Sequence, residues 1–297
     1  MVSTMINKSQ SPALPGSAYR KRPLGRAVGL VYKVDPLGLM GIVLLVGLWF
    51  VLVPVTPRSA LPTPWGVVGA AIDKFWYNKT FAFYGLADTG YFSALVYTTQ
   101  NVLLAVGIGG IIGILLGLIT ARSRILRAGF DPIILTLGTV PILIASPFLL
   151  LLLGGDRASA VATVAFYVTV ILYTYAQRAA DNLNPVYEAA ARTFGATKSR
   201  IIRNVLIPGA LPEILGGIRI GLAGAWGLEA IVELLASQRG MGRLIKSITA
   251  ALDIESLFAA LLILAVTAAI FDMVVAMLFS WITRWRAKTS QPAGGQR

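Results

Sequence analysis

Long apolar stretches recur along the chain and are separated by shorter segments that carry most of the charge. A helix that crosses a membrane needs about 20 predominantly apolar residues. Six stretches meet this requirement, over residues 37–55, 95–119, 132–153, 158–177, 214–236 and 257–282. We therefore predict an all-α membrane protein with six transmembrane helices, its transmembrane domain extending over residues 37–283.

Basic residues are unevenly distributed between the two sides of this predicted membrane domain. The side that holds both chain ends has 18 Lys and Arg residues, and the other side has 7. Because loops rich in Lys and Arg stay in the cytoplasm, we predict that the N and C termini are cytoplasmic. Residues 1–36, with six basic residues and one acid, are predicted to be a basic, disordered cytoplasmic tail. Residues 284–297 are predicted to form a second cytoplasmic tail.

The amino-acid composition excludes several classes of function. The chain has 297 residues, of which 56% are hydrophobic and 13% charged, which is too apolar for an ordinary soluble domain. Its net charge of +13 indicates basic segments that face anionic lipid or a protein partner rather than nucleic acid. The chain has no cysteine and no histidine, which removes thiolate chemistry and the commonest metal ligand. We expect a membrane protein that moves a solute and binds no metal.

Glycines crowd the second apolar stretch. Gly109, Gly113 and Gly117 follow one another at intervals of four, which places them on one helix face. A face of small residues lets another helix backbone approach closely in a membrane. We predict that this helix packs inside the bundle.

The segment 178–212 is predicted to lie on the cytoplasmic side and to be structured. Asn184 precedes Pro185, a combination typical of a helix N-cap with proline at the first helical position. Gly195 suits the C-terminal end of that helix. Thr197 is a suitable cap for a second short helix, which we expect to end before Pro208. The alanine-rich first helix is suited to docking in a groove of a partner.

The same segment resembles the EAA loop of ABC importer permeases. Residues Glu188-Ala-Ala-Ala-Arg-Thr-Phe-Gly-Ala196, then Ile207-Pro208, are similar to the pattern E-A-A-x-x-x-G, nine residues, I-x-L-P. The glutamate stands one residue early, so Ala189 occupies the family's Glu position. The resemblance implies a coupling site for a separate ATPase, made of Glu188, Ala189, Ala190, Arg192, Gly195, Ala196 and Pro208.

Further motifs resemble the nitrate, sulfonate, taurine and bicarbonate group of these permeases. They are Leu61-Pro-Thr-Pro64, Pro141, Pro147 and Gly154 of the third stretch, Ala225-Trp226, Glu233, and Gly240-Met-Gly242. The resemblance implies the type I ABC importer permease fold in a bacterial inner membrane. It also implies a homodimer with a second permease copy, two ATP-binding subunits, and a soluble periplasmic or extracellular binding protein that delivers a small solute of this kind or a related organic molecule.

The chain contains no Gly-Lys dipeptide, so it has no phosphate-binding loop of the G-x-x-x-x-G-K-[ST] type. We therefore expect that it is not an enzyme and carries no cofactor of its own. ATP and magnesium would bind to the partner ATPase.

Acidic residues within apolar stretches often mark a transport pathway. Glu229 and Glu233 lie four apart on one face of the fifth stretch, so one is protonated, a cation lies between them, or they face water. Together with Asp272, Gln100 and Asn101 they are candidates to line or gate the pathway. The alternatives are that Glu233 bonds to the loop containing Gly240 and Gly242, that Asp272 pairs with a basic residue of a neighbouring span, and that the amides only join helices.

Other classes of membrane protein fit the residues less well. A secondary transporter would need coupling-ion sites or a repeat, and the sequence shows neither an internal duplication nor paired interrupted helices at matching positions in two halves. An intramembrane protease would need a motif such as H-E-x-x-H or G-x-G-D, and none is present. A membrane scaffold would explain the hydrophobicity but not the EAA spacing.

Overall fold

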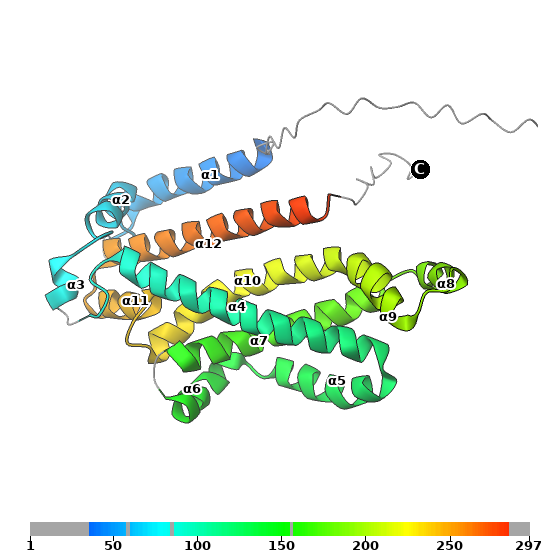
Figure 1. Ribbon diagram of the computed structural model, residues 1–297. Helices are drawn as coiled ribbons and strands as arrows, with labels where there is room; N and C mark the ends of the chain where they lie inside the picture. Colours follow the sequence, from blue (N-terminus) through cyan, green and yellow to red (C-terminus); the bar gives the residue numbers. More distant parts are fainter. Residues whose placement is uncertain (1–35, 58–59, 84–85, 155–156, 285–297) are drawn as a thin grey trace, which may run out of the picture. The chain divides into compact units, whose positions relative to one another are not determined.

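The computed structural model describes residues 36–57, 60–83, 86–154 and 157–284, and no strand occurs among them (Figure 1). The two predicted tails lie outside these residues, apart from their first or last member. The chain divides into two units, residues 1–47 and 48–297. What is described of the first unit is the beginning of helix α1 (Pro36–Leu52), whose apolar side chains are exposed.

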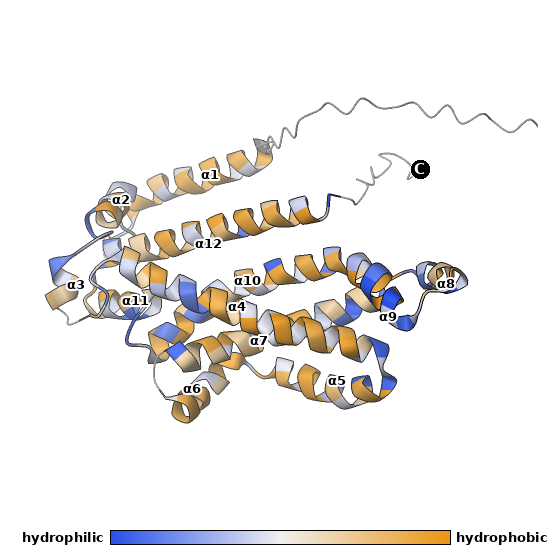
Figure 2. Cartoon of the chain, viewed as in Figure 1, coloured by the Kyte–Doolittle hydropathy of each residue, from blue (hydrophilic) through white to orange (hydrophobic). Residues whose placement is uncertain are grey.

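The second unit contains the remaining helices. In chain order they are the end of α1, the 3₁₀ turn η1 (Val53–Val55), α2 (Pro64–Asp73), α3 (Lys79–Phe83), α4 (Tyr91–Arg122), α5 (Arg124–Thr139), α6 (Ile142–Leu153), α7 (Arg157–Asp181), α8 (Pro185–Thr193), α9 (Lys198–Ile201), the π turn η2 (Ile202–Leu206), α10 (Ile207–Ala236), α11 (Met241–Ala250) and α12 (Ile254–Ile282). Apolar residues dominate the long helices (Figure 2).

Within the described residues, five helical segments are long and apolar enough to cross a membrane. They are Leu37–Val55, Tyr91–Arg122, Arg157–Asp181, Lys198–Leu235 and Ile254–Ile282. A sixth is obtained if α5 and α6 count together, although they are bent by 101°. Five or six spans agree with the all-α membrane fold predicted from the sequence.

The third predicted span, 132–153, is not one straight helix. Helix α5 ends at Thr139, and Val140 adopts an extended conformation (φ −72°, ψ 125°) before Pro141. Proline disfavours helical geometry at the residue before it and has no N–H to continue the helical hydrogen bonding. The chain therefore turns sharply here, and α6 starts in a new direction.

Three long helices, α4, α7 and α10, pack against one another. Val102 and Ala105 of α4 share a buried apolar cluster with Val168 and Leu172 of α7 and with Leu222 of α10. A Cβ atom built at Gly109, Gly113 or Gly117 would lie 2.3–2.5 Å from a carbonyl oxygen of α7. The predicted glycine face is therefore confirmed as the surface on which α7 lies.

A second core lies at the end of this unit that holds α2, α3 and α11. Val67, Phe81 and Tyr91 pack there with Met241 and Ala259. This cluster ties the short helices to the beginnings of α4 and α12.

Polar contacts support the second core. The ammonium group of Lys74 donates to Oδ2 of Asp253 (2.7 Å) and also bonds the hydroxyl of Ser256. Burial raises the pKa of Asp253, but the hydrogen bonds from Lys74 and Ser256 outweigh it and leave that pKa below its ordinary value. The phenol of Tyr91 donates to the carbonyl of Ser256 (2.9 Å).

Candidate functional site

Helix α8 has the two ends that the sequence predicts. The N–H of Val186 donates to Oδ1 of Asn184 (3.0 Å), so Asn184 is the N-cap and Pro185 the first helical residue. Gly195 has φ +73°, and the N–H groups of Gly195 and Ala196 return to carbonyls of the last turn. This pair of bonds is a Schellman cap, which needs a residue that tolerates the left-handed region.

The second predicted helix begins as expected but does not end before Pro208. Thr197 caps α9 by accepting from the N–H of Arg200 (3.4 Å). The chain then passes through the π turn η2 directly into α10, so that Lys198–Leu235 is continuous. Pro208 falls in the first turn of α10, where its missing N–H interrupts little. The prediction of a separate short helix is therefore wrong.

Helix α8 exposes most of its surface. None of its residues is buried, and the large apolar side chains of Val186, Tyr187 and Phe194 are exposed, Phe194 to 89%. Ala189 and Ala190 are exposed as well. At the end of the unit where α8 and α9 lie (Figure 1), this helix presents an apolar surface of small and aromatic residues.

Glu188 points away from that surface. Its carboxylate forms an ion pair with Arg122 at the end of α4, while Arg192 is 3.9 Å away on the same helix. The pair attaches α8 to the transmembrane helices. Of the predicted coupling residues, Glu188 therefore attaches α8 to α4, and Pro208 belongs to α10. Ala189, Ala190, Arg192 and Gly195 are exposed, and Ala196 is half-buried.

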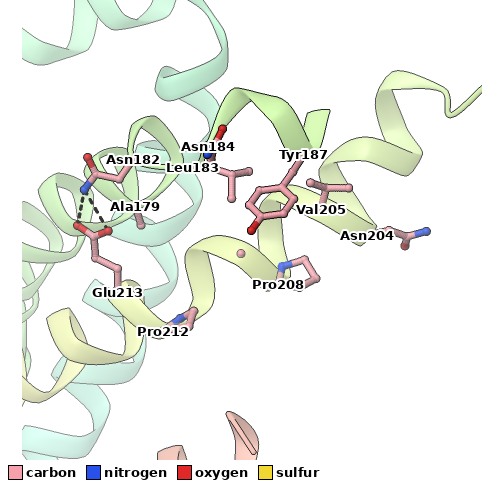
Figure 3. Close-up of a pocket in the computed structure, with 11 residues that line it drawn as sticks. Ala179, Asn182, Leu183, Asn184, Tyr187, Asn204, Val205, Pro208, Pro212 and Glu213 are labelled. Atoms are coloured by element: carbon pink, nitrogen blue, oxygen red, sulfur yellow. Dashed lines mark hydrogen bonds between the residues drawn. The ribbon is translucent and has the colours of Figure 1, made fainter. Parts of the chain in front are cut away.

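A groove separates α8 from the start of α10 (Figure 3). It has a volume of about 850 Å³, and Tyr187 and Pro208 both line it. On its inner side the amide of Asn182 donates to both carboxylate oxygens of Glu213 (3.1 and 3.2 Å). The sequence analysis missed Asn182 and Glu213, because only their proximity in the fold distinguishes them from other polar residues near a helix end.

Glu229 and Glu233 are both completely buried, with 0% of each side chain exposed. The carboxylate of Glu233 accepts from the hydroxyl of Thr98 (2.8 and 2.9 Å) and from the N–H of Gly242 (3.0 Å). Glu229 accepts from the amide of Asn101 (2.8 Å). The bond between Glu233 and the Gly240–Gly242 segment, one of the three alternatives drawn from the sequence, is thus present, and the acids join α10 to α4 and α11.

Gln100 lies apart from this cluster. Its side chain is exposed and accepts a hydrogen bond from the guanidinium of Arg157 (2.7 Å). The two neighbouring amides therefore lie in different environments, Gln100 at the surface and Asn101 in the interior. The guanidinium groups of Arg157 and Arg239 lie 4.8 and 5.1 Å from the ring centre of Tyr97. This arrangement could not be predicted, because its residues lie far apart in the sequence.

Asp272 is not brought together with Glu229 and Glu233. It forms a bidentate ion pair with Arg219, in which Nε lies 2.9 Å from Oδ1 and Nη2 lies 2.6 Å from Oδ2. The pair joins α10 to α12, as the alternative drawn from the sequence expects. Such a pair is a common way to keep a charged residue within a membrane.

Comparison with known proteins places this arrangement in a family. Residues 111–287 match the model of the family described as the binding-protein-dependent transport system inner membrane component. The taurine transport system permease protein TauC of Escherichia coli is 27% identical over 204 residues, covering 69% of this chain and 74% of that protein. The putative aliphatic sulfonates transport permease protein SsuC of Bacillus subtilis is 27% identical over 278 residues, covering 93% and 95%.

Solved structures show the same fold. A chain of a bacterial alginate ABC transporter superposes with a TM-score of 0.55 at 15% identity, covering 85% of this chain and 96% of that one. A chain of an amino acid ABC transporter gives 0.54 at 20% identity, covering 66% and 94%. These identities establish the fold alone, which is that of type I ABC importer permeases. With its matched segment running from within α4 past the end of α12, the chain belongs to the binding-protein-dependent transport system inner membrane components and is a multi-pass ABC importer permease.

Proposed function

We propose that this permease is driven by ATP that two separate subunits bind, with magnesium, and hydrolyse. A second copy of the permease completes the membrane part, and a soluble binding protein delivers the solute. The observation that carries this proposal is the exposed apolar surface of α8, whose ends are held by the Asn184 cap and the Gly195 cap. An apolar helix face of this kind suits a groove on a partner protein.

The contacts of α8 suggest how motion would be transmitted. A partner that displaces α8 would pull on Arg122 of α4 through Glu188. It would also act on α10, because α9 runs into α10 without a break. Ala189, Ala190, Arg192, Gly195 and Ala196 would form or support the contact with the ATPase, and Pro208 would lie at the base of α10.

The pathway residues fall into two groups in this proposal. Glu229, Glu233 and Asn101 would act in gating, by holding α10 to α4 and α11, since they are buried. Asp272 would stabilise the contact of α10 with α12. Gln100 remains a candidate for the pathway surface, because it is exposed beside Arg157.

The proposed solute is a small molecule of the nitrate, sulfonate, taurine or bicarbonate kind, or a related small organic molecule. Relatives named for taurine, aliphatic sulfonates and nitrate support this proposal; the nitrate import permease protein NrtB of Synechococcus elongatus is 27% identical over 203 residues. The proposed location is a bacterial inner membrane, with both termini and α8 on the cytoplasmic side, as the distribution of basic residues favours.

Reconstitution in liposomes tests the proposal. The permease, its ATPase and its binding protein are combined, and accumulation of solute is measured with ATP inside. We expect Ala190→Asp to abolish accumulation by placing a charge in the apolar contact, and Ala251→Asp, at an exposed site after α11, to leave it intact. Accumulation that needs an ion gradient and no ATPase would contradict the proposal and favour a secondary transporter.

A further inference from the structure

The buried acids of α10 lie in neutral surroundings. Glu229 and Glu233 are one helical turn apart. Among the described residues, the groups that donate hydrogen bonds to them are all uncharged: the hydroxyl of Thr98, the amide of Asn101 and the N–H of Gly242. Two ionised carboxylates so close would repel each other strongly where water is excluded. The contacts thus contain no cation that would offset two negative charges.

More distant charges do not remove this imbalance. Among the described residues, the positive charge of Arg157 favours the ionised form of Glu229, and the negative charge of Asp88 disfavours the ionised form of Glu233. Arg157 is exposed and bonded to Gln100. Arg239, the other basic group near Tyr97, is paired with Asp88 at 3.2 Å. Two basic residues, one of them paired with Asp88, therefore accompany three acids, which leaves Arg157 alone to offset two glutamates.

The hydrogen bonding of the two acids is unequal. Glu233 accepts from a hydroxyl and from a backbone N–H, which suits an ionised carboxylate. Within the part of the chain that the structure describes, Glu229 accepts only from Asn101, and its buried Oε2 meets no hydrogen-bond donor. Oδ1 of Asn101, on the partner side chain, is likewise a buried acceptor without a donor. Leaving a buried polar atom without a hydrogen-bond partner is destabilising.

The two unsatisfied acceptors, Oε2 of Glu229 and Oδ1 of Asn101, indicate that a hydrogen-bond donor is missing from this site. Glu229 and Glu233 stand one turn apart on the same face of α10, so their buried carboxyl groups lie beside each other. Two carboxylate oxygens form a hydrogen bond only when one of them carries a proton. A water molecule would supply donors but would leave both charges in place. A metal ion would need more ligands, and no group of three or more acidic, His or Cys residues suited to a metal occurs in the described part of the chain.

We propose that Glu229 and Glu233 form a proton-binding site, in which Glu229 is a neutral carboxylic acid and Glu233 is the carboxylate. A proton on Oε2 of Glu229 turns an unsatisfied acceptor into a donor, for which the Glu233 carboxylate or Oδ1 of Asn101 is the acceptor. Its binding removes one of two like charges. The bound proton thereby holds together the contact of α10 with α4 and α11, and its loss would push these helices apart.

Paired substitutions distinguish the two roles. In Glu229→Gln the amide N–H replaces the acid O–H, so we expect the full-length protein in detergent to unfold near the wild-type temperature. In Glu233→Gln the amide offers one acceptor oxygen where the carboxylate offers two, so it cannot accept from the Gly242 N–H, the Thr98 hydroxyl and the Glu229 O–H together, and we expect a clearly lower temperature. Glu213→Gln, at a half-buried acid of α10 outside this cluster, serves as the matched control. Equal destabilisation by Glu229→Gln and Glu233→Gln, or the reverse order, would overturn the proposal.

Infrared spectroscopy observes the proton itself and does not depend on the variants folding. The wild-type protein at neutral pH should show the C=O stretching band of a protonated carboxyl group, with a shift on exchange into D₂O. The band should disappear in Glu229→Gln and persist in Glu213→Gln. Absence of the band from the wild type, or its persistence in Glu229→Gln, would refute the assignment. Neither readout involves transport, so failure here would leave the importer proposal unaffected.

Discussion

A methyl group added at Gly113 would collide with the backbone of α7. A Cβ atom there would lie 2.5 Å from the carbonyl oxygen of Thr169 and 3.0 Å from the backbone nitrogen of Tyr173. An ordinary contact begins at 3.4 Å, so α4 and α7 would have to separate by about 0.9 Å at this point. Gly109 and Gly117, one turn to either side, approach the backbone of α7 as closely. Helix α4 therefore cannot relieve the collision by tilting without losing these contacts.

The cost of Gly113→Ala follows from this geometry. Overpacking of a well-packed interior costs typically 1–3 kcal/mol, and a backbone atom cannot move aside as a flexible side chain does. We expect the free energy of unfolding to fall by about 2 kcal/mol. Gly107 on the same helix is the matched control, because its Cβ would meet nothing within 4 Å. Gly107→Ala should be neutral or stabilise the helix by up to about 1 kcal/mol.

Thermal unfolding of the full-length protein in detergent, followed by loss of helical circular dichroism, compares these two variants. Gly113→Ala should unfold at a lower temperature than the wild type, and Gly107→Ala should not. If both variants unfolded at the wild-type temperature, α4 and α7 would not be in the close contact described here, and the reasoning from glycine spacing to helix packing would be refuted.

Three further predictions concern charged groups and the α8 cap. Because the folded-state pKa of Asp253 is lowered, its pair with Lys74 should stabilise the protein at pH values above the unfolded-state pKa, and this stabilisation should be lost as the pH falls through the folded-state pKa. Asp253→Asn should therefore make the temperature of unfolding depend less on acid pH. An unchanged dependence would contradict the assignment. Arg219→Gln should destabilise by roughly 1.5–3 kcal/mol by leaving Asp272 without its charged partner, and the double variant with Asp272→Asn should recover part of this loss in the same assay; no recovery would argue against the pair. Gly195→Ala should cost roughly 1–2 kcal/mol through the left-handed conformation alone, since its Cβ meets nothing within 4 Å, and should weaken coupling of ATP hydrolysis to transport; full coupling would show that this cap is dispensable.

Local signals were sufficient for much of the fold. The apolar stretches predict the long helices because length and composition decide which segments enter a membrane. Caps such as Asn184 and Gly195 are equally local, since each bonds within a few residues of itself. The glycine face of α4 was predictable because close backbone approach requires small residues at a fixed interval.

The two errors concern continuity of the chain. Both arise at prolines, and proline has opposite effects at the two places. Pro141 follows the end of α5, where Val140 adopts the extended conformation that a residue before proline prefers. Pro208 stands in the first turn of α10, directly after the π turn η2. The helix continues through this turn although Pro208 has no N–H to donate. Which outcome occurs depends on packing that a sequence alone does not display.

The candidate site was predictable as a set of residues but not as a set of contacts. The acids of the apolar stretches could be named because charge is costly there. Their partners could not, since Asn101 reaches Glu229 and Arg122 reaches Glu188 only after distant helices pack. The groove beside α8 is likewise created by packing and leaves no pattern in the sequence.

The central claim is that α8 docks on a separate ATPase, and site-specific cross-linking tests it most directly. The natural chain has no cysteine, so Ala190→Cys introduces a single thiol on the exposed face of α8. Ala251→Cys provides an exposed control thiol after α11. With cysteines scanned along the groove of the copurified ATPase, the account predicts an oxidative cross-link from position 190 that changes in yield with ATP, and none from position 251. Cross-linking from position 251 but not from position 190 would contradict it.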